Sequence, residues 1–292
     1  MTRKPAVAIV GAGSLATFLA VALRQAGFTI SEIVARDLPQ SRRHARILAA
    51  KVGAQAVTAH SAALDANLLW FCVPDREIRR AAFALAGHLA ARAAVHQKVI
   101  TRWALHSSGA LSSCELDPLR KAGVAVASVH PLMTFVAGAR PSLTGVPFAL
   151  EGDAAAARAA RRIVRELGGE SFSLPAAHKA AYHAWATLTS PLLLAFLLTL
   201  EEAASAAGLA TRQARRASLP IIRQTLANYS SLGPARSFSG PLVRGDAETV
   251  ATHLAVLKKH PRAREVYLAL ARAALHGLPV KNRNGLKRLL RP

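Results

Sequence analysis

An apolar run that ends at a glycine pair and passes directly into a helical pattern is the feature that most limits how this chain can fold. Residues 6–10 are of strand type, and apolar side chains recur at helical spacing in residues 14–26. Between them, Gly11 permits a tight turn, and Gly13 lets another molecule approach the backbone where the helix begins. The segment therefore predicts a strand–turn–helix unit, a building block of parallel sheets.

The same alternation continues along the first part of the chain. The sequence predicts helices near residues 41–52, 77–94 and 154–167, and strands at 30–35, 56–57, 68–73, 99–105, 124–129, 147–151 and 171–174. Strands that alternate with helices form a parallel sheet whose two faces are covered. After Pro175 the strand patterns stop, and helices broken by glycine and proline turns run to the end.

These patterns predict an α/β protein with two domains. Residues 1–175 are expected to form a Rossmann-type doubly wound parallel sheet, and residues 176–292 an all-helical C-terminal domain. A chain of 292 residues with 52% hydrophobic content is long enough to fill two cores.

The charge balance is strongly basic, with 38 Lys and Arg against 16 Asp and Glu and a formal net charge of +22. The arginines are spread through alanine-rich helical segments, and aromatic residues make up only 5% of the chain. Helices with a solvated basic face explain this pattern, so we expect no nucleic-acid partner but an attraction to anionic ligands such as cofactor phosphates. A basic nucleic-acid-binding module is the competing hypothesis, and it predicts duplex binding with a steep salt dependence.

Cysteine and histidine positions bear on compartment and metal content. Neither Cys72 nor Cys114 stands in a redox or metal-ligand spacing, which favours a reducing cytoplasm, and the scattered histidines predict no metal site. The uncharged run 184–200 is short for a membrane span and is interrupted by Pro191. We expect no membrane contact and interpret this run as a buried domain-core or dimer-interface helix.

The glycine turn matches the Gly-x-Gly-x-x-Ala form of the dinucleotide fingerprint. In this pattern the third small residue lets helix and strand pack closely, and the helix amino terminus receives the phosphate charge. We therefore expect a cofactor to bind over Gly11, Ala12, Gly13, Ser14, Leu15 and Ala16. The alternative is a sterically required turn in a fold that has lost its ligand.

The end of the second strand distinguishes between cofactors. An arginine there accommodates the extra phosphate of NADP, whereas a carboxylate binds the ribose hydroxyls of NAD. The sequence has Arg36 followed by Asp37. Arg36 favours NADP, and Asp37 keeps NAD as the less favoured alternative.

Three further predicted strands end in residues that are suited to bind a cofactor or a substrate. Val73 and Pro74 are expected to line the cofactor, and His130 follows another strand at the same edge. The segment His106-Ser107-Ser108-Gly109 places Ser107 beside the cofactor, with Ser107, Ser108 and Gly109 available to a substrate carbonyl or carboxylate. A serine nucleophile is disfavoured because no Gly-x-Ser-x-Gly elbow surrounds these serines. For His130 a purely structural role is the alternative.

The first helix after Pro175 carries a polar stripe. Lys179 and His183 share a face at i, i+4, and Ser190 is expected on the same face. A cleft-facing lysine suits proton donation to a carbonyl that receives hydride, while a snorkelling lysine above a core histidine is the alternative. Further on, Arg244 is expected to bind a substrate carboxylate and Asp246 to cap a helix.

These motifs together resemble one bacterial group, the Rossmann-like proteins with a helical C-terminal domain of unknown function. Those proteins are described as NADP oxidoreductases and are related to pyrroline-5-carboxylate reductase, the β-hydroxyacid dehydrogenases and alternative ketopantoate reductases. The resemblance covers nearly the whole chain, and its most specific segments are His-x-Ser-Gly, Tyr-His and Gly-Pro-x-x-Arg-Gly-Asp.

The resemblance implies a homodimer through the helical domain, which would also bind substrate, and an active site between the domains. Lys179 would correspond to the catalytic lysine of the β-hydroxyacid dehydrogenases. One position departs from the pattern, because Ser190-Pro191 stands where Ser-Asn is expected.

We accordingly predict an NADP-dependent reductase of a small 2-oxo acid or imine, with a ketopantoate-like compound as one substrate. Lys179, His183, His130 and Ser108 are the catalytic candidates, and Ser107, Gly109, Ser190 and Arg244 are the substrate-binding candidates. The alternative, favoured by Pro191, is a non-catalytic NAD(P)-binding sensor or regulatory protein.

Overall fold

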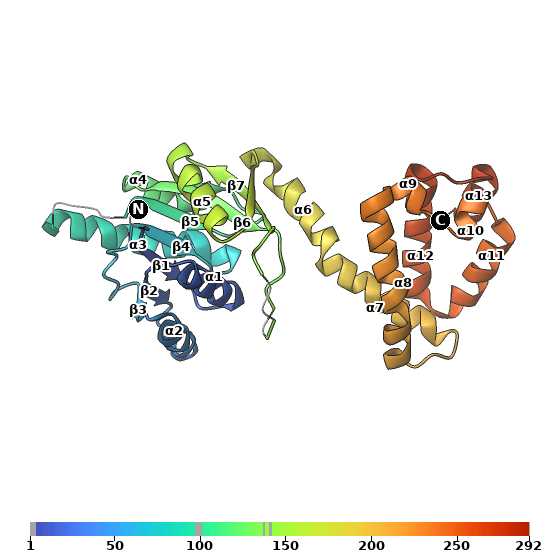
Figure 1. Ribbon diagram of the computed structural model, residues 1–292, viewed down its shortest axis with the longest axis horizontal. Helices are drawn as coiled ribbons and strands as arrows, with labels where there is room; N and C mark the ends of the chain where they lie inside the picture. The colour runs from blue at the N-terminus through green and yellow to red at the C-terminus, as the bar shows by residue number, and fades with distance from the viewer. Residues whose placement is uncertain (1–3, 97–100, 137, 140–141, 292) are drawn as a thin grey trace. The chain divides into compact units, whose positions relative to one another are not determined.

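The computed structural model describes residues 4–96, 101–136, 138–139 and 142–291. By its internal contacts the chain divides into two compact units, Met1–Thr187 and Leu188–Pro292. The first contains the sheet with its covering helices, and the second is helical (Figure 1). This is the α/β fold with a helical C-terminal region that the sequence predicts.

The described part of the first unit forms one eight-stranded sheet, in the order β3-β2-β1-β4-β5-β6-β7-β8. Strands β1 to β6 are mutually parallel, β7 runs antiparallel to β6, and β8 runs parallel to β7. The strands span Val7–Val10 (β1), Ile30–Ala35 (β2), Gln55–Thr58 (β3), Leu68–Phe71 (β4), Trp103–His106 (β5), Ala125–Pro131 (β6), Pro147–Gly152 (β7) and Glu170–Ser173 (β8).

The order of the first six strands is that of a Rossmann fold, so the predicted doubly wound sheet is confirmed. The last two strands depart from a fully parallel sheet. Parallel neighbours need a crossover, usually a helix, and the described residues between β6 and β7 contain no helix, so the chain returns in the opposite direction. A helix does join β7 to β8, and those two strands are parallel again.

Helices cover both faces of the sheet. One core packs α1 (Ser14–Gln25), α2 (Pro39–Val52) and α5 (Ala154–Glu166) against the sheet, and the other packs α3 (Asp75–His96) and α4 (Asp117–Lys121) against the opposite face. The buried residues of α1 follow the i, i+3, i+4, i+7 spacing of a single helix face: Ala16, Leu19, Ala20 and Leu23. Each fully buried leucine of this kind stabilises the fold by roughly 1.5–3 kcal/mol.

The first compact unit extends beyond the expected boundary at Pro175. A short 3-10 turn, Ala176–His178, leads into α6 (Lys179–Thr189), and the unit ends at Thr187 within that helix. The reason is that α6 buries Lys179 and Tyr182, whose polar atoms bond to the ends of the sheet strands. The beginning of the helical segment is thus part of the sheet unit.

The second unit consists of helices drawn from golden yellow through orange to red in Figure 1. Its core joins three of them and contains Val250, Leu254, Leu268, Ala271, Leu275, Leu286 and Leu290. The helices of the described part are α7 (Pro191–Ser205), α8 (Thr211–Leu232), α9 (Pro234–Ser237), α10 (Pro241–Arg244), α11 (Ala247–Val256), α12 (Pro261–Gly277) and α13 (Arg283–Leu289), with a 3-10 turn at Leu257–Lys259.

Helix α7 is apolar but not buried in the described chain. It has no buried side chain, and Leu194 is 62% exposed. The interpretation of this run as a domain-core helix is therefore wrong, and the dimer-interface interpretation stays a prediction. By length and composition alone, the helical segment Ala176–Ser205 could also cross a membrane, with a mean hydropathy of 1.5.

Candidate functional site

The chain turns at Gly11 after β1, and the geometry of this turn requires a glycine. Its φ is +112°, and a Cβ added to it would lie 2.4 Å from the carbonyl oxygen of Cys72. The Gly11 amide donates to the carbonyl of Val34, which fixes the turn against β2. A side chain at this position would both strain the backbone and collide with the loop after β4.

Gly13 differs from Gly11 because the protein itself does not require a glycine there. Its φ is −82°, and no atom lies within 4 Å of the place a Cβ would occupy. Helix α1 begins directly after it, without a side-chain cap and without an acidic residue in its first turn. Open space in front of uncapped helix amides is what a bound phosphate needs. Ala16, two residues into the helix, is fully buried against the sheet.

The end of β2 carries two charged and exposed residues, Arg36 and Asp37. The carboxylate of Asp37 forms an ion pair with Arg42 of α2. The backbone carbonyl of Arg36 accepts a hydrogen bond from the Leu38 amide. The carboxylate at this edge is therefore partly neutralised, and Arg36 leaves the surroundings basic.

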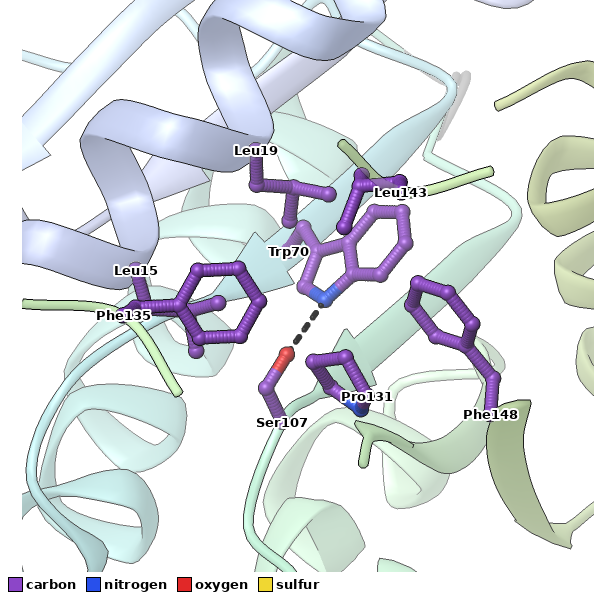
Figure 2. A pocket seen from close by; sticks show the side chains of 8 residues that line it. All are labelled: Leu15, Leu19, Trp70, Ser107, Pro131, Phe135, Leu143 and Phe148. Carbon is purple, nitrogen blue, oxygen red and sulfur yellow. Dashed lines mark hydrogen bonds between the residues drawn. The ribbon is translucent and has the colours of Figure 1, made fainter. Parts of the chain in front are cut away.

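An apolar layer surrounds the indole ring of Trp70 (Figure 2). Its side chains leave no space for a water molecule, so it is packed interior rather than a substrate cavity. One polar contact crosses it, in which the indole N–H of Trp70 donates to Ser107 Oγ at 2.9 Å. This bond anchors Ser107 beside Leu15. The layer consists of Leu15, Leu19, Trp70, Ser107, Pro131, Phe135, Leu143 and Phe148.

His106, at the end of β5, is buried and holds the loop that follows it. Its Nδ1 accepts a hydrogen bond from the Ser108 amide, so the ring proton is on Nε2, which donates to the carbonyl of Ser112. Burial lowers the pKa of His106 to about 4, with smaller contributions from Lys179 and His130. The ring is neutral at pH 7 and acts as a fixed support for the loop.

The hydroxyl of Ser108 is fully engaged. It donates to Asp75 Oδ2 at 2.9 Å and accepts from the amides of Ala110 and Leu111. Its carbonyl oxygen, in contrast, faces Lys179. The geometry therefore gives the Ser108 side chain a role in shaping the turn and brings its backbone into the site.

Lys179 is the central polar group of this region. Its side chain is 2% exposed, and Nζ donates to the Ser108 carbonyl at 3.0 Å and to Ser128 Oγ. Burial lowers its pKa to about 8, while the more distant carboxylates of Glu151 and Asp75 oppose this shift. Such an amine exchanges a proton close to neutral pH. The snorkelling alternative is excluded, because the amine is inside the fold.

A histidine pair and a glycine adjoin the lysine. His130 Nδ1 lies 2.7 Å from the Tyr182 hydroxyl, and the rings of His130 and His183 meet edge to face with centroids 6.1 Å apart. A Cβ on Gly109 would lie 2.7 Å from His183 and 2.9 Å from His130 Nε2. Gly109 is therefore the residue that lets the two imidazoles approach the loop after β5.

Two of the predicted substrate-binding residues, Ser190 and Arg244, lie in the second unit. Ser190 stands between α6, which ends at Thr189, and α7, which begins at Pro191, so the helical spacing from Lys179 does not reach it. Pro191 is the first residue of α7, a position suited to proline. Arg244 ends α10. The roles of Ser190 and Arg244 toward a substrate stay predictions, whereas Asp246 caps α11 as expected, accepting from the Thr249 amide.

The remaining candidates stand at the same edge of the sheet. Val73 and Pro74 follow β4, and Ser14 is exposed at the start of α1. Sequence reasoning missed two residues that act on Lys179. Ser128 accepts a hydrogen bond from its amine, and the charge of Glu151 raises its pKa. For Ser128 a signal existed, because it precedes His130 by two residues and a strand places such residues on one face. Among the described residues, no cluster of three or more metal-ligating side chains occurs.

The strand order and the glycine turn define the class, a Rossmann-like fold with a helical C-terminal region. The chain matches the family described as a Rossmann-like domain over residues 2–131, and the family described as a domain of unknown function, DUF2520, over residues 146–274. The chain is therefore similar to the first family in its amino-terminal part and to the second in the part that follows. No curated protein matches the sequence.

Solved structures share this fold over nearly the whole chain. A "putative NADP oxidoreductase" from Bacteroides fragilis is 22% identical, with a TM-score of 0.72 over 92% of this chain and 97% of that one. A protein from Thermotoga maritima is 24% identical, with a TM-score of 0.69 over 91% and 96%. An imine reductase from Myxococcus stipitatus is 16% identical, with a TM-score of 0.65 over 93% and 94%. At these identities the likeness establishes the fold.

Proposed function

We propose that this protein is an NADP-dependent reductase of a small substrate with a C=O or C=N bond, such as a 2-oxo acid or an imine. One observation carries the proposal. An open glycine turn, at Gly13, and a buried lysine, Lys179 of α6, with a pKa of about 8, both lie at the carboxyl ends of the parallel strands. A turn required only for folding explains neither feature.

The residues present fit a dinucleotide. Gly13 leaves room at the uncapped start of α1 for a pyrophosphate, and Arg36 supplies a cation for the phosphate that distinguishes NADP from NAD. Val73 and Pro74 follow β4 at the same edge and are suited to line the ribose. The comparisons support this choice, since the Myxococcus stipitatus imine reductase and a Plasmodium falciparum pyrroline carboxylate reductase have structures with NADP.

The proposed chemistry divides between cofactor and protein. When bound, the nicotinamide supplies a hydride, with its electron pair, to the substrate carbon. The ammonium of Lys179 gives a proton to the substrate oxygen or nitrogen, which accepts the electron pair of the C=O or C=N π bond, and a neutral amine remains. His130 and His183, which both lie close to Gly109, orient the substrate, and Ser190 and Arg244 stay candidates for binding it.

A non-catalytic sensor is the second candidate function. Pro191, the residue that favoured it, now has a structural explanation. Pro191 opens α7 at a position where a proline is structurally suited, so its presence needs no loss of activity to explain it. A sensor has no need of a buried lysine whose charge costs stability. We therefore rank the reductase first.

We also propose that the protein is cytoplasmic and forms a homodimer through its helical unit. Apolar side chains on α7 and α8 are each at least 40% exposed, which is more than an isolated surface tolerates well. A second copy of the chain could cover this apolar surface, because most homo-oligomers pair the same surface of both subunits. Light scattering of Leu194→Glu would detect a shift from dimer to monomer. These side chains include Leu192, Leu194, Leu198, Leu219, Ile221 and Leu226.

The deciding experiment is a titration with NADPH and, separately, NADH, followed by nicotinamide fluorescence. The proposal predicts tighter binding of NADPH, and Arg36→Ala should weaken NADPH roughly tenfold or more, because it removes a charge-assisted bond, while NADH binding changes little. Arg46→Ala, at an exposed position of α2, is the matched control and should bind like the wild type. Absence of binding for both nucleotides would overturn the proposal.

A positive titration leads to a substrate panel. Ketopantoate, related 2-oxo acids and cyclic imines are tested for NADPH oxidation with the wild type and with Lys179→Met. The reductase proposal predicts turnover on at least one compound and a loss of at least 100-fold in the variant. NADPH binding without turnover on the panel would favour the sensor.

A further inference from the structure

The amine of Lys179 is held by the side chain of Ser128 as well as by the backbone carbonyl of Ser108. Ser128 lies on β6, is fully buried, and its hydroxyl contacts both the Lys179 amine and the carbonyl of Ser108. A buried hydroxyl between a carbonyl and an amine has few ways to orient its hydrogen. The contacts of Ser128 therefore fix the direction of its O–H bond as well as its position.

The carbonyl of Ser108 determines how the Ser128 hydroxyl points. Ser128 Oγ lies 3.0 Å from this oxygen, which can only accept, so the hydroxyl hydrogen is directed to it. The lone pairs of Ser128 Oγ then face Lys179 Nζ, which donates to it. The amine also donates to the same Ser108 carbonyl, so the three groups form a closed triangle.

Resting on the proposed function, we infer that Ser128 is a positioning residue: its oriented hydroxyl and the Ser108 carbonyl together hold Lys179 Nζ in place while the amine gives up and regains its proton. An ammonium has three N–H donors, and two of them are used here. The third is free to reach a substrate. A neutral amine keeps both bonds with its two remaining hydrogens, so the lysine does not need to move between the two states.

Charge-assisted hydrogen bonds explain how this arrangement affects the proton. The oxygen of Ser128 stabilises the ammonium more than the neutral amine, because bonds from an ionised donor are the stronger ones. Removing the oxygen should therefore lower the pKa of Lys179 below its present value of about 8. The titratable groups that interact with the amine are Asp75, His106, His130 and Glu151, and His130 in turn contacts Tyr182 and His183.

The test compares the wild type with Ser128→Ala and Ser128→Thr in the full-length chain. Lysine side chains labelled with ¹³C at Cε are titrated by NMR, and the Lys179 signal is identified by its absence in Lys179→Met. We expect the midpoint of Lys179 to fall by roughly one pH unit in Ser128→Ala and to return toward the wild-type value in Ser128→Thr, which keeps the hydroxyl. Should Ser128→Ala fail to fold, Ser128→Cys, with a weak acceptor, makes the same comparison.

Thr101→Val is the matched control. Thr101 is also buried and bonds to the carbonyls of Leu64 and Ala66, but it precedes β5 and so lies at the opposite edge of the sheet. Its replacement should lower stability and leave the Lys179 midpoint unchanged. A midpoint that moves equally in Thr101→Val, or stays fixed in Ser128→Ala, would overturn the inference.

The second readout is the pH dependence of kcat/KM for NADPH-dependent reduction. Activity that needs the ammonium declines as the pH rises through the pKa of Lys179, and Ser128→Ala should move this decline to lower pH. The two readouts separate the two proposals. A shifted NMR midpoint without any reductase activity would refute the reductase and support the positioning role, whereas activity with unshifted profiles would refute the positioning role alone.

Discussion

The phenolic oxygen of Tyr182 lies 2.7 Å from Nδ1 of His130, and the two rings meet edge to face with centroids 5.5 Å apart. Burial raises the pKa of Tyr182 to about 12 and lowers that of His130 to about 4, with further lowering by Lys179 and His183. At neutral pH the hydroxyl therefore donates to Nδ1, and the ring proton of His130 is on Nε2. This bond determines which nitrogen His130 presents beside Gly109.

In Tyr182→Phe the ring proton of His130 should no longer be fixed on Nε2. The variant loses one hydrogen bond, which costs about 1 kcal/mol of unfolding free energy, and leaves His130 as a mixture of tautomers. If His130 orients the substrate through Nε2–H, kcat should fall roughly tenfold, equivalent to about 1.4 kcal/mol. Urea denaturation and ¹⁵N NMR of the imidazole measure the first two effects. Tyr229→Phe, at a residue that is 60% exposed, should change none of them.

Gly11→Ala should lower the stability of the protein, whereas Gly13→Ala should lower its affinity for NADPH. The first places a Cβ 2.4 Å from a backbone oxygen at a positive φ and should destabilise the protein by about 2–4 kcal/mol. The second meets open space, so its melting temperature should stay close to that of the wild type while NADPH affinity falls. Thermal unfolding with and without NADPH measures both. Equal NADPH affinity in the wild type and Gly13→Ala would contradict a phosphate at this turn.

Lys179→Met should make the protein more stable below pH 8. The folded pKa of Lys179 is lowered to about 8 from 10.5, so the folded state holds the charged amine at a cost below pH 8, and this cost disappears as the pH rises to 10.5. The shift corresponds to about 3 kcal/mol, from which the lost hydrogen bonds subtract. The stability difference between Lys179→Met and the wild type should shrink between pH 8 and 10.5. Denaturant titrations at several pH values test this, and a constant difference would count against a strained lysine.

Acid should destabilise the protein through its buried histidines. His106 has a folded pKa of about 4 instead of 6.5, so it contributes stability that is complete above pH 6.5 and is lost as the pH falls toward 4. The full difference is about 3 kcal/mol, and His130 acts in the same direction. In His106→Gln the dependence of the unfolding free energy on pH should be flatter over this window. A control at the exposed His60, His60→Gln, should keep the wild-type slope.

The local parts of the site were predictable from sequence. Gly11, Gly13 and Arg36 were identified because a strand, a glycine turn and a helix follow one another within a few residues, and the chemistry of the turn depends on backbone geometry alone. Lys179 and His183 were found because a charge on an apolar helix is unusual. The sequence did not reveal that the Ser108 hydroxyl is committed to Asp75, a residue 33 positions away along the chain.

The antiparallel pairing of β6 with β7 and the position of the domain boundary also depend on more than local sequence. The positions of β7 and β8 were predicted from their apolar pattern, but their direction depends on the connection from β6, and no local pattern records direction. The boundary was expected at Pro175 because the strand patterns end there. It lies beyond Thr187 because Lys179 and Tyr182 bond to residues of the sheet unit, which only folding brings together.

By itself, the sequence determined the fold class and the candidate glycine turn, because hydrophobic periodicity and glycine conformations act over a few residues. Only the tertiary structure decided which polar groups meet: Ser128 with Lys179, Tyr182 with His130, and Gly109 with two imidazoles. Those contacts set burial and hydrogen bonding, and through them the pKa values of Lys179 and His130. Proton chemistry depends on such long-range contacts, and so it cannot be derived from residue types and spacing alone.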